Sequence, residues 1–435
     1  MFKKLMLAGL LLSAVSLLGK TLAFFRDVLF ARELGFNNQL DNYLMLFTLA
    51  MFLVSIVTGA LNSVFASYIR RHSLSFHSFY KQFSALVCLL VLVFSICCLY
   101  VLPSAFSILS NASIFVVFCF VGVTAAGLYQ APLVALLTAK KQQVFLSVSQ
   151  LVLPAMGVVT VLSLIIVQLP ITVVDLTLAL LFAYVIHFVL LFARSRRFLS
   201  DLTVSERDSG ESLKVSNKPL FKEFGWIVVS SSLLATLPIV DLAFASQLGD
   251  GSVSILSNGY KFVTVAQSVL AMSLGSLLIP YMAEWADDLT LLRQRLIKAL
   301  GAAGGVGVAV GLFLYVIMPF AVSIMFNGSE VTNSQSAELS EVGQAYTLLV
   351  PFYLVGMVLS RCVVSLGKAK LMLTINGVAF ILNIVMDYLM SSWFGLIGIA
   401  FTTSIIYLIS VLMLFWVLRS VFVNSSGLTL RKQHD

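Results

Sequence analysis

Several ionisable residues lie in or beside the first apolar run of the chain. Lys20, Arg26 and Asp27 fall inside this run, Asp41 opens the next one, and Lys261 lies deep in a later run. A charged side chain at the centre of a membrane helix costs about 2.5–3.5 kcal/mol on insertion scales, so such groups usually face a cavity. Because the basic residues outnumber the deep carboxylate, we expect a positively charged cavity that suits a phosphate or diphosphate. The alternative is an internal ion pair that only orients the helices.

A second set of polar residues carries oxygen atoms. Asp241 lies in one apolar run, Thr403 lies in the last run, and Asn383 and Asp387 share a helical face four residues apart. Oxygen ligands without sulfur or imidazole suit a hard cation such as Na⁺, or one carboxylate could carry a proton. Hydrogen bonding between helices would explain the same residues without any ion.

Composition predicts a membrane protein. Of 435 residues, 60% are hydrophobic and 11% are charged, whereas a soluble domain carries about 25% charged residues. A span needs about 20 apolar residues. We therefore predict an all-α polytopic protein with about twelve transmembrane helices, near residues 5–34, 41–69, 82–102, 113–138, 144–168, 171–193, 224–248, 253–282, 296–326, 343–366, 371–391 and 393–422.

Basic residues alternate between successive connections. Connections that contain Lys or Arg, near residues 3–4, 70–81, 140–141, 194–222, 293–298, 368–370 and 431–432, are separated by connections that contain neither. Since basic connections stay in the cytoplasm, we expect both termini to be cytoplasmic. Topology then explains most of the net charge of +8, which gives no indication of a nucleic-acid partner.

The chain is predicted to contain two halves. The polar stretch between the sixth and seventh spans divides an N-terminal six-helix lobe, residues 1–205, and a C-terminal lobe, residues 223–435, with a cytoplasmic linker at 206–222. The pattern D-x-x-F-A-x-x-L-G occurs at residues 27–35 and again at 241–249. Six intervening spans place both copies in the same direction, as in transporters built from parallel repeats.

Enzyme motifs are absent from the sequence. It contains no nucleophile motif, P-loop, dinucleotide fingerprint or HExxH pattern. We therefore expect a transporter without a resident cofactor and without catalytic residues. The ninth span is rich in glycine, at residues 301, 304, 305, 307 and 311. Small residues allow close helix packing, and a hinge is the other interpretation.

With these residues, the chain resembles the MurJ/MviN family of lipid II flippases, in the multidrug/oligosaccharidyl-lipid/polysaccharide exporter superfamily. The matching motifs are Lys20-x5-Arg26-Asp27 with Ala31-Arg32-x-x-Gly35 and Asp41; Asp241-x-x-Phe244-Ala245-Ser246-x-Leu248-x-x-Gly251-Ser252-Val253-Ser254 with Lys261 and Pro280; Ser360-Arg361-x4-Leu366-Gly367-x-x-Lys370; and Leu382-Asn383-Ile384 with Asp387. The similarity extends from near the start of the chain to the twelfth span.

The resemblance implies a V-shaped, MATE-like pair of six-helix lobes around a cationic cavity that opens alternately to the two sides. It assigns substrate binding to five residues and a sodium site to four residues and a backbone oxygen. The first set is Lys20, Arg26 and Lys261 with Asp27 and Asp41; the second is Asp241, Asn383, Asp387 and Thr403, with the backbone near Ile399. Na⁺ is then the candidate coupling ion.

Three differences from the family bear on the substrate. Lys20 and Lys261 replace arginines, which loses bidentate phosphate geometry; residues 51–56 are apolar where the family has a basic pair; and twelve spans are predicted instead of fourteen. We therefore expect a flippase, able to act as a monomer in the bilayer, for lipid II or a related undecaprenyl-diphosphate-linked oligosaccharide. The alternatives are a cation-coupled multidrug exporter of the same superfamily, which the excess of Lys and Arg disfavours, and a membrane glycan polymerase, which usually has a larger external loop.

Overall fold

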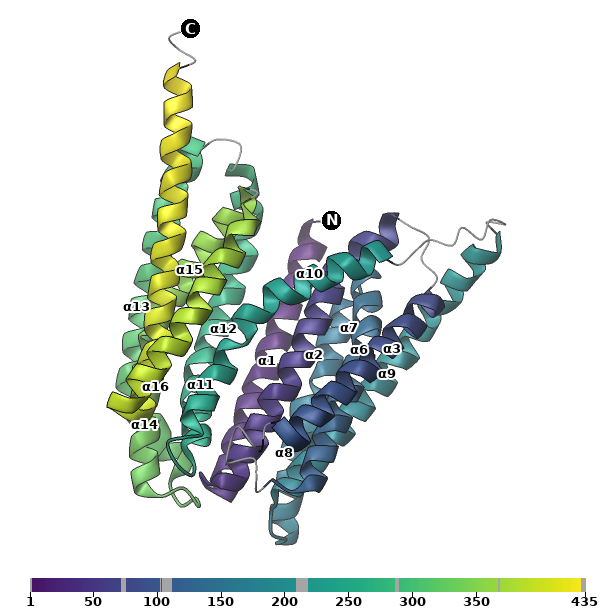
Figure 1. Ribbon diagram of the computed structural model, residues 1–435, viewed down its shortest axis with the longest axis vertical. Coiled ribbons are helices and arrows are strands. Elements are labelled where there is room, and N and C mark those ends of the chain that lie inside the picture. The colour runs from purple at the N-terminus through teal and green to yellow at the C-terminus, as the bar shows by residue number, and fades with distance from the viewer. Residues whose placement is uncertain are drawn as a thin grey trace. The chain divides into compact units, whose positions relative to one another are not determined.

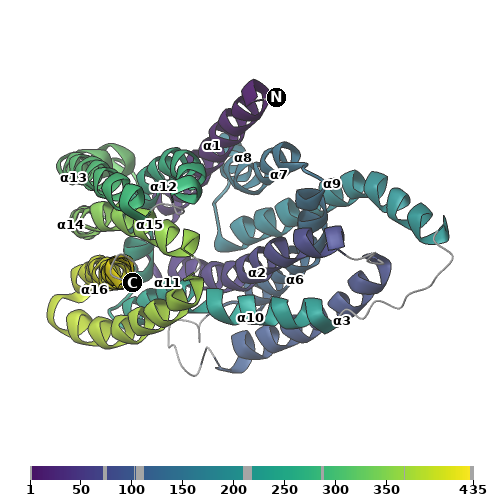
Figure 2. The same ribbon diagram turned by 90° about the horizontal axis from the view of Figure 1, so that it is seen from above.

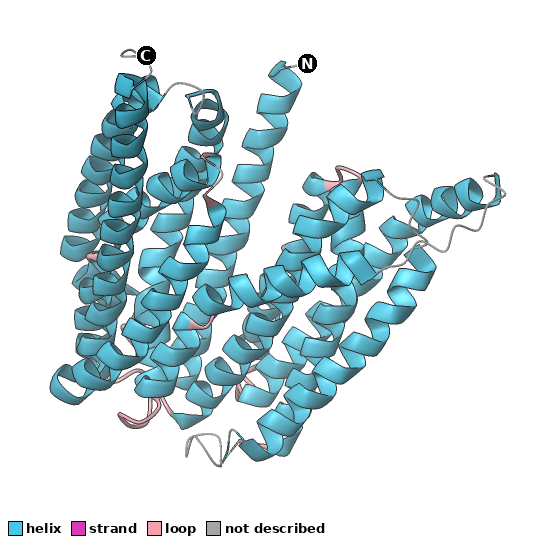
Figure 3. Cartoon of the chain, turned by 45° about the horizontal axis from the view of Figure 1, so that its top comes forward, coloured by secondary structure: helices cyan, strands magenta, loops and turns pink. Residues whose placement is uncertain are grey.

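The computed structural model describes residues 2–71, 76–101, 103, 112–208, 218–285, 289–366 and 368–431. Helices are the only regular secondary structure in these segments (Figure 3). In chain order they are α1 (Phe2–Leu34), α2 (Asn38–Arg71), α3 (Phe76–Ile96), the π-helix η1 (Cys97–Val101), α6 (Ile114–Ala139), α7 (Gln143–Gln150), α8 (Val152–Val167), α9 (Val173–Asp208), α10 (Lys218–Ala235), α11 (Leu237–Ala245), α12 (Ser252–Trp285), α13 (Leu289–Phe326), α14 (Asn333–Thr347), α15 (Leu349–Ser365) and α16 (Ala369–Arg431).

The helices confirm the prediction of an all-α membrane protein. Each predicted span coincides with one helix, with two consecutive helices, or with one half of α16. Within the described segments, 8 helices are long and apolar enough to cross a membrane, or 9 if the bent pair α10–α11 forms one span. The longest of them, Lys370–Ser420, is interrupted at Gly395 and covers two predicted spans.

The chain forms two compact units, Met1–Ile239 and Val240–Asp435. The boundary between the units lies inside α11, and residues 209–217 of the predicted linker lie outside the described segments. Aromatic contacts hold α10 in the first unit, since Phe221 stacks on Phe79 at 5.8 Å and Phe224 meets Phe83 edge-on at 6.5 Å. Burial of such rings is a large apolar contribution to packing.

In the first unit, α2, α6 and α9 pack together, and α1 packs against α7 and α8 (Figure 1). A buried polar network links three of these helices. Gln130 on α6 donates from Nε2 to the carbonyl oxygen of Tyr184, and its Oε1 lies 2.8 Å from Nδ1 of His187 on α9. Nε2 of His187 lies 3.1 Å from the Ser149 hydroxyl on α7. Buried polar groups must be paired in this way.

In the second unit, α12, α13, α14 and α15 pack in contact, and α16 lies against α14 and α15 (Figure 2). Close packing explains part of the glycine-rich ninth span. A Cβ at Gly307 would lie 2.5 Å from Cα of Pro351, whereas a Cβ at Gly305 would meet nothing within 4 Å. Gly307 therefore lets the backbones of α13 and α15 approach closely, and Gly305 does not take part in that contact.

The sequence repeat has a structural counterpart in both units. Asp27 and Asp241 are each buried near the end of a helix, and each copy ends at a glycine with positive φ, 70° at Gly35 and 120° at Gly249. L-residues rarely adopt these angles, so the glycine in each copy is required by the turn. The residue before the aspartate differs between the copies, since it is Arg26 in the first and Val240 in the second.

Candidate functional site

Two sites can be built from the polar residues inside the helices, one in each unit. The basic site belongs to the first unit and contains Arg26 and Asp27 on α1. Nη2 of Arg26 donates to Oδ1 of Asp27 at 2.6 Å, and its Nε donates to the same oxygen at 2.8 Å. Only 6% of Arg26 and 8% of Asp27 are exposed. A buried ion pair this close is tightly held, because removing one partner would leave the other charge uncompensated.

Aromatic rings and a glycine enclose the Arg26 side chain. Its guanidinium carbon lies 5.6 Å from the ring centre of Phe30 and 5.4 Å from that of Phe47, within cation–π range. A Cβ at Gly157 on α8 would lie 2.6 Å from Cδ of Arg26. Because residue 157 is a glycine, α8 leaves room at this point for the Arg26 side chain that pairs with Asp27.

The other predicted substrate-binding residues have different surroundings. Lys20 on α1 is exposed, Asp41 at the start of α2 is fully buried, and Lys261 on α12 is partly exposed. Lys261 belongs to the second unit and the other four to the first. The structure thus pairs Arg26 with Asp27, as the ion-pair alternative expected, and leaves the shared role of all five residues in substrate binding a prediction.

The acidic site lies within the second unit and centres on Asp241 of α11. Nδ2 of Asn383 donates to Oδ1 of Asp241 at 3.1 Å, and the Thr403 hydroxyl lies 3.0 Å from Oδ2 of the same carboxyl group. Thr403 Oγ1 also lies 3.3 Å from the carbonyl oxygen of Ile399. The Asp387 carboxyl group interacts with that of Asp241. The structure therefore brings together the four predicted side chains and the backbone oxygen at Ile399.

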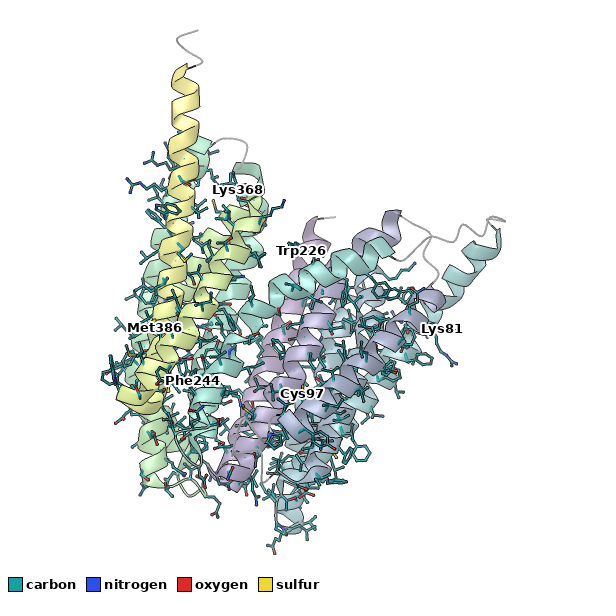
Figure 4. The ribbon with its side chains drawn as sticks, in the orientation of Figure 1. Lys81, Cys97, Trp226, Phe244, Lys368 and Met386 are labelled. Atoms are coloured by element: carbon teal, nitrogen blue, oxygen red, sulfur yellow. The ribbon has the colours of Figure 1, made fainter. Side chains whose placement is uncertain are left out.

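The break in α16 explains how residues far apart on one helix reach the same carboxyl group. Gly395 has φ 59° and ψ −137°, which are non-helical angles that end the first half and begin the second. A Cβ at Gly398 would meet the carbonyl oxygen of Met390, so the turn is tightly packed. Asn383 and Asp387 come from the first half, and Thr403 comes from the second. Figure 4 labels Phe244 and Met386, which neighbour the site on α11 and α16.

Several oxygen atoms at this site have no hydrogen-bond partner. Oδ1 of Asn383 and both carboxylate oxygens of Asp387 are buried without one, and these residues are 1% and 0% exposed. A buried polar atom without a partner costs about 1–3 kcal/mol, and more when it is charged. Unpaired acceptors beside a second carboxylate form an electron-rich pocket, which a bound cation or a proton would stabilise.

The donor set fits a hard monovalent cation. Two carboxylates, an amide oxygen, a hydroxyl and a backbone carbonyl are all oxygen ligands, the type that alkali and alkaline-earth ions prefer. Within the described segments, no group of three or more His, Cys, Asp and Glu residues could hold a metal. The site thus lacks the nitrogen and sulfur ligands that transition metals favour.

Sequence reasoning did not find the aromatic residues around these sites. Tyr43 lies beside the Arg26–Asp27 pair, and Tyr346 and Tyr260 interact with Asp241. The rings of Tyr260 and Tyr346 are 5.1 Å apart. Tyrosine is common at apolar positions of membrane helices, so only spatial proximity to a buried charge distinguishes these residues.

Helices long and apolar enough to span a membrane, with ionisable groups buried among them in each of two units, define a multi-span membrane protein. The particular family follows from sequence. The family model described as "Lipid II flippase MurJ" matches residues 30–433. The chain therefore belongs to the MurJ lipid II flippase family. A search of curated protein sequences finds no match.

Solved structures show the same fold. "Lipid II flippase MurJ, inward closed conformation" aligns with TM-score 0.74 and 20% identity over 94% of this chain and 87% of that one. An inward-facing multidrug resistance MATE family transporter of the MOP superfamily aligns with TM-score 0.72 and 17% identity, over 94% and 96%. An outward-facing transporter of that description aligns with TM-score 0.60 and 13% identity, over 97% and 96%. At these identities the likeness concerns the fold alone.

Proposed function

We propose that the protein is a flippase that moves an undecaprenyl-diphosphate-linked oligosaccharide, lipid II or a related polysaccharide precursor, across the bacterial cytoplasmic membrane. The observation that carries this proposal is the family match over residues 30–433. Alternating access is supported by the fold, which other transporters adopt in inward-facing and outward-facing states. The basic connections support a topology with both termini in the cytoplasm. No catalytic residue is needed for this work.

The diphosphate is the part of the substrate that the basic residues would bind. Lys20 and Lys261 are the accessible cations, since Lys20 is exposed and Lys261 is partly exposed. Arg26 donates to Asp27 from Nε and Nη2 in this structure, which leaves other N–H groups of the guanidinium to bind a phosphate oxygen. Charge-assisted hydrogen bonds from a guanidinium to phosphate are among the strong ones. Asp27 and Asp41 would be the acidic companions of these cations.

Sodium is the coupling ion that the acidic site would hold. The unpaired oxygens of Asn383 and Asp387, beside Asp241 and Thr403, support a cation site inside the second unit. The repeat supports it too, because Asp27 has an arginine next to it and Asp241 has Val240. When bound, the ion would supply the positive charge that the pocket lacks, and the side chains would exclude water from it.

Complementation in bacteria depleted of their essential lipid II flippase tests this function. Survival with the wild-type protein, and loss of survival with Lys261→Ala at equal membrane levels, would support flipping of the peptidoglycan precursor. Failure of a stably inserted wild type would indicate a different lipid-linked glycan. Export of organic cations in place of lipid would favour the multidrug exporter instead.

A further inference from the structure

A tyrosine in the basic site has a hydroxyl group with no partner. Tyr43 on α2 is 1% exposed, and its hydroxyl oxygen is buried without a hydrogen bond. Folded proteins pair nearly all buried polar groups, because an unpaired one has a free-energy cost. Groups that violate this rule while the rest of the site is well packed are often retained for function at a cost in stability.

The ring of Tyr43 is fixed by aromatic contacts. It meets Phe30 edge-on at 5.8 Å, stacks on Phe47 at 6.1 Å and lies 5.4 Å from Phe120. Phe30 and Phe47 are also the rings against which the Arg26 guanidinium lies. The same aromatic residues therefore position the phenol and the guanidinium.

The hydroxyl group lies in the electrostatic field of the ion pair. Tyr43 interacts with Arg26 and Asp27 from α1 and with Tyr184 from α9. These partners are otherwise engaged, because Arg26 donates to Asp27 and the Tyr184 hydroxyl donates to Sδ of Met51 at 3.0 Å. Tyr43 thus retains an unused O–H donor next to the cation that the proposed function assigns to the substrate.

We propose that Tyr43 is a further substrate-binding residue, whose hydroxyl donates a hydrogen bond to the anionic oxygen that Arg26 binds. The ligand is a phosphate or diphosphate group, and the inference rests on the proposed function of the basic site. A phenol that donates to a charged oxygen forms a hydrogen bond stronger than one between neutral groups. No proton is transferred, and the tyrosine remains neutral throughout.

Tyr43→Phe tests this proposal, because phenylalanine keeps the ring contacts and removes only the hydroxyl. The purified full-length protein is assayed for binding of undecaprenyl diphosphate and for flipping of lipid II in vesicles. We expect the dissociation constant to rise about tenfold or more, as for the loss of one charge-assisted hydrogen bond. The thermal unfolding midpoint should stay equal or rise, because an unpaired buried donor is removed.

Tyr184→Phe is the matched control. It removes a hydroxyl near Arg26 that already has a partner in Met51, so lipid binding should change less than with Tyr43→Phe. Equal lipid affinity of wild type and Tyr43→Phe would overturn the inference while leaving the proposed function in place. A lowered unfolding midpoint with no change in affinity would show a structural hydroxyl and overturn it as well. Absence of diphosphate-lipid binding and flipping in the wild type would instead refute the proposed function, on which the inference depends.

Discussion

Replacement of Asp387 by asparagine should separate the stability of the fold from the stability that a bound cation adds. Both carboxylate oxygens of Asp387 are buried and make no hydrogen bond. The substitution Asp387→Asn keeps the size of the side chain and removes a carboxyl group that interacts with that of Asp241. Without sodium, the variant should be at least as stable as the wild type, because two adjacent buried carboxyl groups must either repel each other as charges or share a proton.

With sodium the order should reverse. A ligand that binds only the folded state stabilises it by RT ln(1 + [L]/Kd), which is about 2.7 kcal/mol at one hundred times Kd. The wild type should gain this amount and the variant much less, because it lacks one of the two carboxylates. The measurement is thermal unfolding in detergent while NaCl replaces choline chloride at constant ionic strength, so that general salt effects cancel.

Asp175→Asn provides a control for the loss of a carboxylate elsewhere. Asp175 is partly exposed at the start of α9, where its Oδ2 accepts from the backbone N–H and the hydroxyl of Thr172. Its replacement should lower stability by about 0.5–1 kcal/mol in both salts and leave the sodium response intact. A wild type that sodium does not stabilise, or an Asp387→Asn variant with an undiminished sodium response, would refute the assignment of the cation site.

Two further predictions concern glycines against which other atoms pack. Gly307→Ala should destabilise the protein by about 1–3 kcal/mol, because the new Cβ would press on the backbone of Pro351. Gly305→Ala, which meets open space, should stabilise it by about 0.5–1 kcal/mol through helix propensity; equal effects in thermal unfolding would contradict this account. Gly157→Ala should displace the Arg26 side chain, which the new Cβ would contact. The loss in unfolding free energy caused by Gly157→Ala should therefore be smaller in an Arg26→Ala background. Additive losses in this double-mutant cycle would show that the two residues are independent.

The hydrophobic runs were sufficient to predict the helices, because a bilayer allows few alternatives to a helix of about 20 apolar residues. The break in α16 was anticipated as well, since Ser391 and Ser392 separate the predicted spans 371–391 and 393–422, and the structure places the non-helical residue nearby, at Gly395. The grouping of α10 with the first unit could not be predicted, because it depends on aromatic contacts with α3 that the spacing of residues in the sequence does not show.

The two sites differed in how far the sequence predicted them. Asn383 and Asp387 lie four residues apart, and the side chains chosen with them do converge on Asp241. An internal ion pair was one of two interpretations of the basic residues, but its partners Arg26 and Asp27 could not be predicted, because sequence neighbours on a helix point in different directions. Here Phe47 from α2 and the missing side chain at Gly157 enforce the pairing.

The two copies of the repeat differ in how the charge of the buried aspartate is balanced. In the first copy the positive charge that pairs with Asp27 belongs to the neighbouring residue Arg26. Its distance from Asp27 along the chain is fixed, whatever ions the solution contains. In the second copy Val240 takes that place, and the cation proposed for the acidic site would balance Asp241. If that proposal holds, stability of the second unit should depend on the salt present, and the Arg26–Asp27 pair of the first unit should not. The substitution Val240→Arg would place an arginine before the aspartate in both copies of the repeat.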